Sequence, residues 1–230
     1  MAPTNQLHDF IKAVGVLNLD GNIYGPNGAN LMLNKSMGTV FGLGINAQDY
    51  LNPHQLTIPS QTGLIFRYRL QNGFEYADRT SIDPANYDNG GVLTALQNNN
   101  RWSVQHINLF QSGLARIQYG QEEYNSLEEA EADLKTGNFV VENNIGSNAI
   151  FRSYLIVKKN ATNLSDPLQA KFIPVGKFGN VVSGAVSLTY QAIVGALGYT
   201  PEDSANTTRT QHYDPEMQFK GVDKTVTTKW

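Results

Sequence analysis

The chain has 230 residues, a formal net charge of −3 and 16% charged residues, and it contains no cysteine. Its length suits one large domain, or one domain with an appendage. The weak charge, with no basic run longer than Lys158-Lys159, excludes a phosphate-backbone interface, so we expect no nucleic-acid partner. The absence of cysteine excludes disulfides and thiol chemistry.

The composition also indicates a structural class. Asn, Gln, Ser, Thr and 21 Gly take the place of charged residues, which favours turn-rich β structure. The N-terminus has no basic region followed by an apolar stretch, and no window approaches the roughly 18 apolar residues of a membrane span. We therefore expect neither a secreted precursor nor membrane insertion.

The clearest strand signal is the alternation in residues 64–70, LIFRYRL. A strand here places four apolar side chains on one face: Leu64, Phe66, Tyr68 and Leu70. The strand ends in Gln71-Asn72-Gly73, a hairpin signal.

Arg67 and Arg69 share the opposite face of this predicted strand. We interpret that face as solvated, and the alternative is an anion site. Two arginines without a glycine-rich loop or a helix N-terminus form no phosphate cradle, which favours the solvated face.

Further strands are predicted downstream, over residues 102–110, 114–119, 151–158 and 170–175. The first two flank the turn Gln111-Ser112-Gly113. Several strands at this spacing without alternating helices predict a mainly β fold, an antiparallel β-sandwich or jelly-roll-like module.

One short helix interrupts the predicted strands. Ser126 and Glu129 form a capping box. Apolar residues then recur at helical spacing: Leu127, Ala130 and Leu134. Lys135 supplies a C-terminal charge, and Gly137 is expected at the C′ position that ends the helix.

Six carboxylates lie between Glu122 and Asp133 with no base among them, which raises the alternative of a cation site. We favour a structural role, because four of them lie in or before the first turns of the helix, where the dipole favours carboxylates. The four histidines have no partner at metal-ligand spacing: His8, His54, His106 and His212. No nucleophile motif, phosphate loop or marked carboxylate pair is present, so we predict no catalytic residue, no metal, no cofactor and no enzyme.

Residues 181–197 are small and apolar, and they predict a short helix that ends at Gly198, with Pro201 beyond it. The polar, Thr-rich sequence after Glu202 cannot bury a core of its own. We therefore divide the chain into a β-rich module, 1–179, and a helix-turn linker with an extended oligomerisation or attachment tail, 180–230. The candidate interface residues are Val186, Leu188, Ile193, Val194, Leu197, Tyr199 and Pro201.

Two parts of the sequence resemble a known group. The blocks TGLIFRYRLQNG, SIDPANYDNGG, RWSVQHINLFQSGLARIQYGQEEYNSLEEAEADL and KKNATNLSDPLQAKFIPVGKFG resemble a module of tailed-bacteriophage structural proteins, found in tail fibres, spikes and related virion appendages. This resemblance covers about residues 37–179. ALGYTPEDSANTT, residues 196–208, resembles an element that phage fibre proteins carry between a globular module and the shaft or tip.

The resemblance implies a structural part of a virion appendage, a fibre, spike or collar adaptor, which is assembled in the host cytoplasm. It implies a homo-oligomer, most simply a trimer, that contacts other virion proteins. One alternative is a receptor module that binds a host-surface glycan through exposed aromatic rings such as Trp102, although such rings more often fill a core. A depolymerase is the third and weakest alternative.

Overall fold

The computed structural model describes residues 15–42 and 44–176, which all belong to the first predicted domain, 1–179. The prediction of a mainly β fold is confirmed, because this part of the chain forms thirteen strands, most of them in antiparallel pairs, and two short helices. The predicted linker and tail, 180–230, lie outside the described residues.

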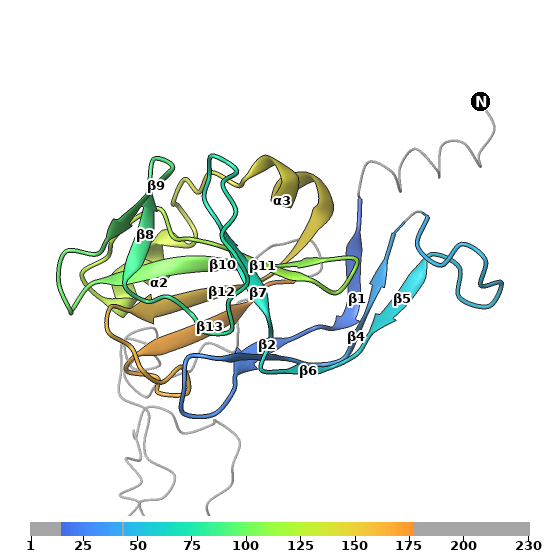
Figure 1. Cartoon of the computed structure of the whole chain (residues 1–230), viewed down its shortest axis with the longest axis horizontal. Helices are drawn as coiled ribbons and strands as arrows, with labels where there is room; N and C mark the ends of the chain where they lie inside the picture. The colour runs from blue at the N-terminus through green and yellow to red at the C-terminus, as the bar shows by residue number, and fades with distance from the viewer. Residues whose placement is uncertain (1–14, 43, 177–230) are drawn as a thin grey trace, which may run out of the picture. The chain divides into compact units, whose positions relative to one another are not determined.

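A five-stranded sheet forms the centre of the module (Figure 1). Its order is β13 (Ala170–Pro174), β12 (Ala149–Lys158), β10 (Trp102–Phe110), β11 (Ala115–Gln118) and β7 (Phe66–Arg69). The first four strands pair antiparallel, whereas β11 and β7 run parallel. A register shift between Ile107 and Asn108 bulges the β10–β12 pair.

Three smaller sheets surround the central sheet (Figure 1). One joins β1 (Leu17–Gly21), β4 (Gly38–Phe41) and β5 (Gln55–Ile58), and a second joins β2 (Tyr24–Pro26), β3 (Leu33–Lys35) and β6 (Gln61–Thr62). The third is the hairpin of β8 (Asn86–Asn89) and β9 (Val92–Ala95). The first of these sheets contacts the end of the central sheet, where Val40 and Ile58 pack with Leu109 and Ile150.

One side of the central sheet, called the apolar face from here on, carries most of the core. Ile107, Ile117 and Leu155 on this face have no exposed surface. They pack with Tyr24 and Leu33 from the second small sheet. The predicted alternation in residues 64–70 is confirmed, since all four apolar members are at most 3% exposed: Leu64, Phe66, Tyr68 and Leu70.

The other side of the sheet, called the mixed face, is partly covered by α2 (Leu127–Asp133). The capping serine is confirmed, because the Ser126 hydroxyl accepts a hydrogen bond from the Glu129 amide at 3.1 Å. Ala130 of α2 packs on Trp102 and Ile156 of the sheet. Helix α2 therefore closes only one end of this face.

A second helix, α3 (Asn143–Asn148), was not predicted, since its sequence NNIGSN is poor in helix formers. It begins at Glu142, whose carboxylate accepts hydrogen bonds from the amides of Asn144 and Ile145 at 2.9 and 3.0 Å. A buried Ile145 anchors it. Side-chain capping and one apolar contact thus stabilise this helix despite the weak helix propensity of its sequence.

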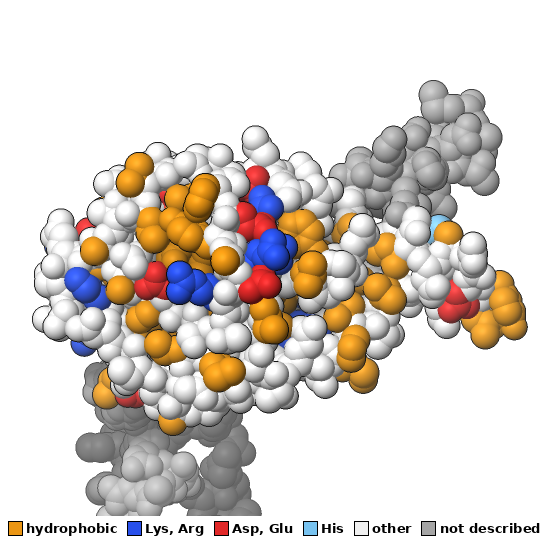
Figure 2. All heavy atoms as spheres, in the orientation of Figure 1, with side chains coloured by type: hydrophobic (Ala, Val, Ile, Leu, Met, Phe, Trp, Pro, Cys, Tyr) orange, Lys and Arg blue, Asp and Glu red, His pale blue; other side chains and the backbone are white. Residues whose placement is uncertain are grey.

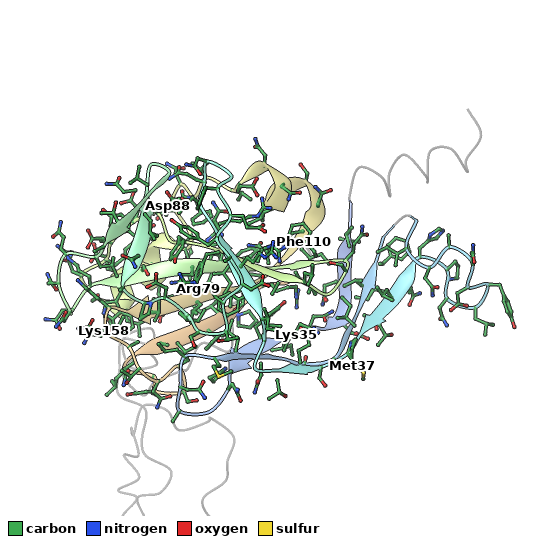
Figure 3. All side chains as sticks on the ribbon, in the orientation of Figure 1. Lys35, Met37, Arg79, Asp88, Phe110 and Lys158 are labelled. Carbon is green, nitrogen blue, oxygen red and sulfur yellow. The ribbon has the colours of Figure 1, made fainter. Side chains whose placement is uncertain are left out.

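Two buried cations hold the turn between β1 and β2. The Lys35 ammonium donates to Asn22 Oδ1 at 3.0 Å and to the carbonyls of Ser36 and Pro59 at 2.9 Å. Arg152, at the β12 bulge, donates to the Asn22 carbonyl at 3.4 Å. Figure 3 shows Lys35 directed inward and nearby Met37 directed outward. Neutral oxygens alone satisfy the ammonium, and burial lowers the pKa of Lys35.

Candidate functional site

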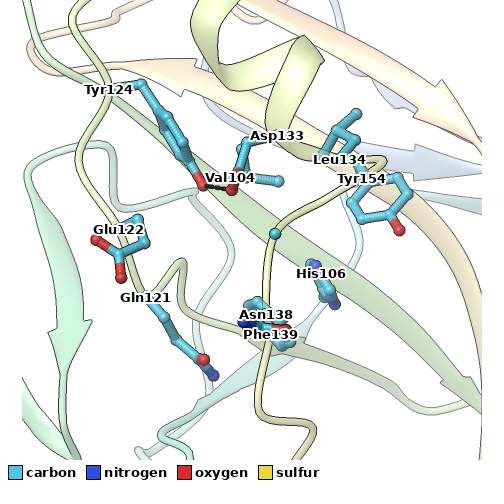
Figure 4. Close-up of a pocket in the computed structure, with 11 residues that line it drawn as sticks. Val104, His106, Gln121, Glu122, Tyr124, Asp133, Leu134, Asn138, Phe139 and Tyr154 are labelled. Carbon is cyan, nitrogen blue, oxygen red and sulfur yellow. Dashed lines mark hydrogen bonds between the residues drawn. The ribbon is translucent and has the colours of Figure 1, made fainter.

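The mixed face contains a hollow beside the C-terminal end of α2 (Figure 4). Its cavity volume is about 60 Å³, and it opens to solvent. Its lining combines aromatic rings with carboxylates and amides, among them His106, Glu122, Tyr124, Asp133, Asn138 and Tyr154. No lysine or arginine is among the residues that line it.

The floor of the hollow comes from two paired strands. His106 of β10 lies opposite Tyr154 of β12, and their rings meet edge to face at 4.8 Å between centroids. Phe139 stacks on the His106 ring at 3.4 Å. His106 is only 8% exposed, its imidazole makes no hydrogen bond within the described residues, and its nitrogens keep some contact with solvent. Burial lowers the pKa of His106 to about 3, so the ring is neutral at neutral pH.

The rim of the hollow is set by the close approach of a loop to α2. Tyr124 donates its hydroxyl proton to Asp133 Oδ2 at 2.6 Å. A Cβ on Gly137 would lie 2.3 Å from the same oxygen, so a larger residue there would displace the Asp133 carboxylate. Gly137 was predicted as the C′ residue of the helix, and that prediction is wrong. Helix α2 ends at Asp133 with Leu134 as its C-cap, and Gly137 serves the contact instead.

The loop that follows Gly137 is fastened to the sheet. Gln121 donates to the Val140 carbonyl at 2.7 Å and accepts from the Val140 amide at 2.8 Å. Gln118 of β11 donates to the same carbonyl at 2.7 Å. These three bonds hold Phe139 against His106, so they fix one wall of the hollow.

The electrostatic character of the hollow is acidic. Four carboxylates line it or its outer mouth: Glu122, Glu123, Glu129 and Asp133. Glu123 lies 4.0 Å from Arg101, and Glu129 accepts from the Asn125 amide at 2.7 Å. Glu122 and the second oxygen of Asp133 have no hydrogen-bond partner in the described part of the chain. These two carboxylates are therefore free to accept from a ligand.

The six-carboxylate run of the sequence is thus divided by the structure. Glu131 pairs with Lys171 at 2.5 Å, away from the hollow. Within residues 15–42 and 44–176, no group of three or more His, Cys, Asp or Glu side chains could hold a metal ion. Sequence reasoning marked no carboxylate pair, and it missed that Glu122 and Asp133 share a hollow. The Tyr124–Asp133 hydrogen bond joins residues nine positions apart, a spacing that carries no motif.

Elsewhere on the mixed face, the arginines of β7 form an ion-pair network around Glu75. This carboxylate lies 2.6 Å from Arg69, 2.8 Å from Arg67 and 3.1 Å from Arg116. Figure 2 shows blue and red side chains side by side over β7. Burial raises the pKa of Glu75, but hydrogen bonds from Arg67 and Arg69 outweigh it and lower that pKa to about 2. Internal carboxylates therefore neutralise the arginines, and the face is neither fully solvated nor free to bind an anion.

Several predicted residues take no part in the hollow. Trp102 is 7% exposed and packs under α2, so it presents no ring to a ligand. His54 lies in the loop between β4 and β5 and packs edge-on against Phe41. His8, His212 and the predicted interface residues from Val186 to Pro201 lie outside the described residues.

Comparisons with known proteins identify no relative of this chain. No family model, no curated protein and no solved structure matches the chain. Among the described helices, none is long and apolar enough to cross a membrane.

Proposed function

We propose that the chain is a structural component of a tailed-phage virion appendage, a fibre, spike or collar adaptor, and that it contributes to assembly or attachment. The observation that carries the proposal is where the phage-like sequence blocks lie. They contain β7, β8, β10, β11, α2 and β13, so they make up most of the central sheet and its covering helix. A resemblance that covers the core of a module is stronger support than one confined to a loop.

Exposed apolar side chains support the assembly role. Tyr50 and Leu51 in the loop between β4 and β5 are 88% and 71% exposed, and Met37 is 62% exposed. A virion subunit covers such side chains with neighbouring copies or other virion proteins. The sequence after residue 179 supplies a further apolar segment, and we propose that it forms the contact of a homotrimer.

The experiment is sedimentation equilibrium on the full chain at tens of micromolar, followed by two variants with the same change. Leu197→Asp places a charge in the proposed contact, whereas Leu168→Asp places it at a side chain that is 77% exposed on the module. We expect a trimer for the wild type and for Leu168→Asp, and dissociation for Leu197→Asp with the melting transition of the module retained. A monomeric wild type, or equal behaviour of the two variants, would contradict the proposal.

Binding of a host glycan remains the second candidate function. The observation that favours it is the hollow of the mixed face, where Tyr154 and Phe139 lie beside free carboxylates. Trp102, the ring first considered for this role, is excluded by its burial. A glycan array probed with the labelled full chain tests this candidate, and the absence of any retained glycan would count against it.

A further inference from the structure

The hollow of the mixed face has a hydrogen-bonding character that limits what it binds. Five lining residues have side-chain polar groups that make no hydrogen bond within the described part of the chain: Glu122, Asp133 through its second oxygen, His106, Asn138 and Tyr154. The two carboxylates are acceptors only, and a neutral imidazole has one acceptor nitrogen. The Asn138 amide and the Tyr154 hydroxyl can also donate, but acceptors outnumber donors in this set, which favours a ligand with several donors.

The buried His106 is the observation that distinguishes the hollow from a solvated cluster of acids. A polar ring that is 8% exposed normally has a hydrogen-bond partner, and this one has none among the described residues. Figure 4 shows one of its nitrogens on the side where Asp133 and Tyr154 also lie. Because the imidazole nitrogens keep some contact with solvent, they can bond to water or to a donor group that enters the hollow.

The charge and the aromatic surface of the hollow further limit the class of ligand that it can bind. The lining contains carboxylates and no lysine or arginine, so an entering cation meets no repulsion there. Tyr124, Tyr154 and Phe139 add ring surface, which attracts ammonium groups through its quadrupole. An alkylammonium group has three N–H donors and no acceptor, which complements this set of acceptors.

We propose that the hollow binds an alkylammonium group, with Glu122 and Asp133 as its charge partners and His106 as the acceptor at the floor. Two sources carry this chemistry, a free polyamine and an amino sugar with an unacetylated amine. The inference does not depend on the assembly role proposed above, and its failure would leave that role untouched.

The test is isothermal titration calorimetry on the full chain at low ionic strength with three probes. These are spermidine, a trimer of β-1,4-linked glucosamine and the matching trimer of N-acetylglucosamine, in which each amine is acetylated and carries no charge. We expect binding of spermidine, of the glucosamine trimer, or of both, and no binding of the acetylated trimer. Spermidine alone would identify a polyamine site, and the glucosamine trimer alone an amino-sugar site.

Two variants of equal charge control for unspecific attraction. Glu122→Gln removes a carboxylate of the hollow, and Glu128→Gln removes one that is exposed on α2 outside it. Because a hydrogen bond to a charged group is involved, we expect about a tenfold or greater loss of affinity for the first variant and none for the second. His106→Phe, which keeps the stacked ring, is expected to lose affinity as well. Equal losses in the two glutamine variants, equal binding of the acetylated trimer, or no binding of either amine would overturn the inference.

Discussion

The same strands form both faces of the central sheet, but the two faces have different roles. On the apolar face, Ile107 and Leu155 have no exposed surface and pack into a continuous cluster. On the mixed face, their chain neighbours His106 and Tyr154 floor a hollow. Since successive side chains of a strand point to opposite sides, one strand supplies stability on one side and a candidate binding surface on the other.

The mixed face also differs in how its polar groups are satisfied. Around Glu75, three arginines and a carboxylate satisfy one another. In the hollow, the exposed Glu122 and the buried His106 make no side-chain hydrogen bond to the described residues. A protein tolerates unpaired polar groups mainly where a ligand or water completes them. The contrast therefore separates a structural part of this face from the part where we propose that a ligand binds.

Among single substitutions, the largest loss of stability is expected on the apolar face. Ile107→Ala should lower the free energy of unfolding by about 2 to 5 kcal/mol, because it opens a cavity in a closed cluster. Ile65→Ala is the matched control, since Ile65 is 59% exposed and its loss should cost less than about 0.5 kcal/mol. Urea denaturation of both variants checks the difference. Equal losses of stability in the two variants would contradict the distinction between the closed apolar cluster and the exposed surface.

A pH effect of intermediate size is expected from His106. Its pKa is about 3 in the folded chain against 6.5 for a free imidazole. Below pH 6.5 the unfolded chain takes up a proton that the folded chain refuses, so stability falls as pH falls toward 3. The loss should reach about 1 to 3 kcal/mol within two pH units.

His106→Phe keeps an aromatic ring in place and removes the proton site. The stability of the wild type should therefore fall relative to that of the variant as the pH is lowered. The two values converge and then cross if the variant is the less stable at neutral pH, and they diverge if it is the more stable. Parallel pH profiles would show that the buried imidazole does not titrate in this way.

The smallest effect is expected from the Glu75 network. Glu75→Gln should cost about 1 to 2 kcal/mol near neutral pH, because partly exposed ion pairs are weak but several meet at this carboxylate. The pKa of Glu75 is about 2 when folded against 4.5 when free, so its contribution is complete above pH 4.5 and is lost as pH falls toward 2. Asp78→Asn, which removes only a more exposed contact to Arg67, should cost less in thermal denaturation. A larger loss for Asp78→Asn would contradict the central position of Glu75.

Sequence reasoning worked where a signal is local. The alternation from Leu64 to Leu70 and the turn at Gly73, whose φ is +91°, were both predicted and found. The strand predicted over residues 102–110 has those bounds in the structure. Apolar alternation and turn residues are patterns of a few consecutive positions, so they can be recognised without knowledge of the fold.

Sequence reasoning failed where the decisive contact is remote. The parallel pairing of β7 with β11 joins segments separated by about fifty residues, and no turn motif marks it. Nothing in the sequence distinguishes Glu75 from an exposed surface carboxylate. Its role follows from the β7–β11 pairing, which places Arg67 beside Arg116. The hollow likewise depends on a loop fastened by Gln121, whose amide role no local pattern indicates.

The division between the two faces is tested most directly by two neighbouring residues of β10 measured for two properties. For Ile107→Val and His106→Phe we would determine both the free energy of unfolding at neutral pH and the affinity for the amine probe that the wild type binds. The account predicts that Ile107→Val loses about 0.5 to 1.5 kcal/mol of stability with unchanged affinity. It predicts that His106→Phe loses affinity while remaining folded. Loss of affinity in Ile107→Val, or full affinity in His106→Phe, would contradict the assignment of stability to one face and binding to the other.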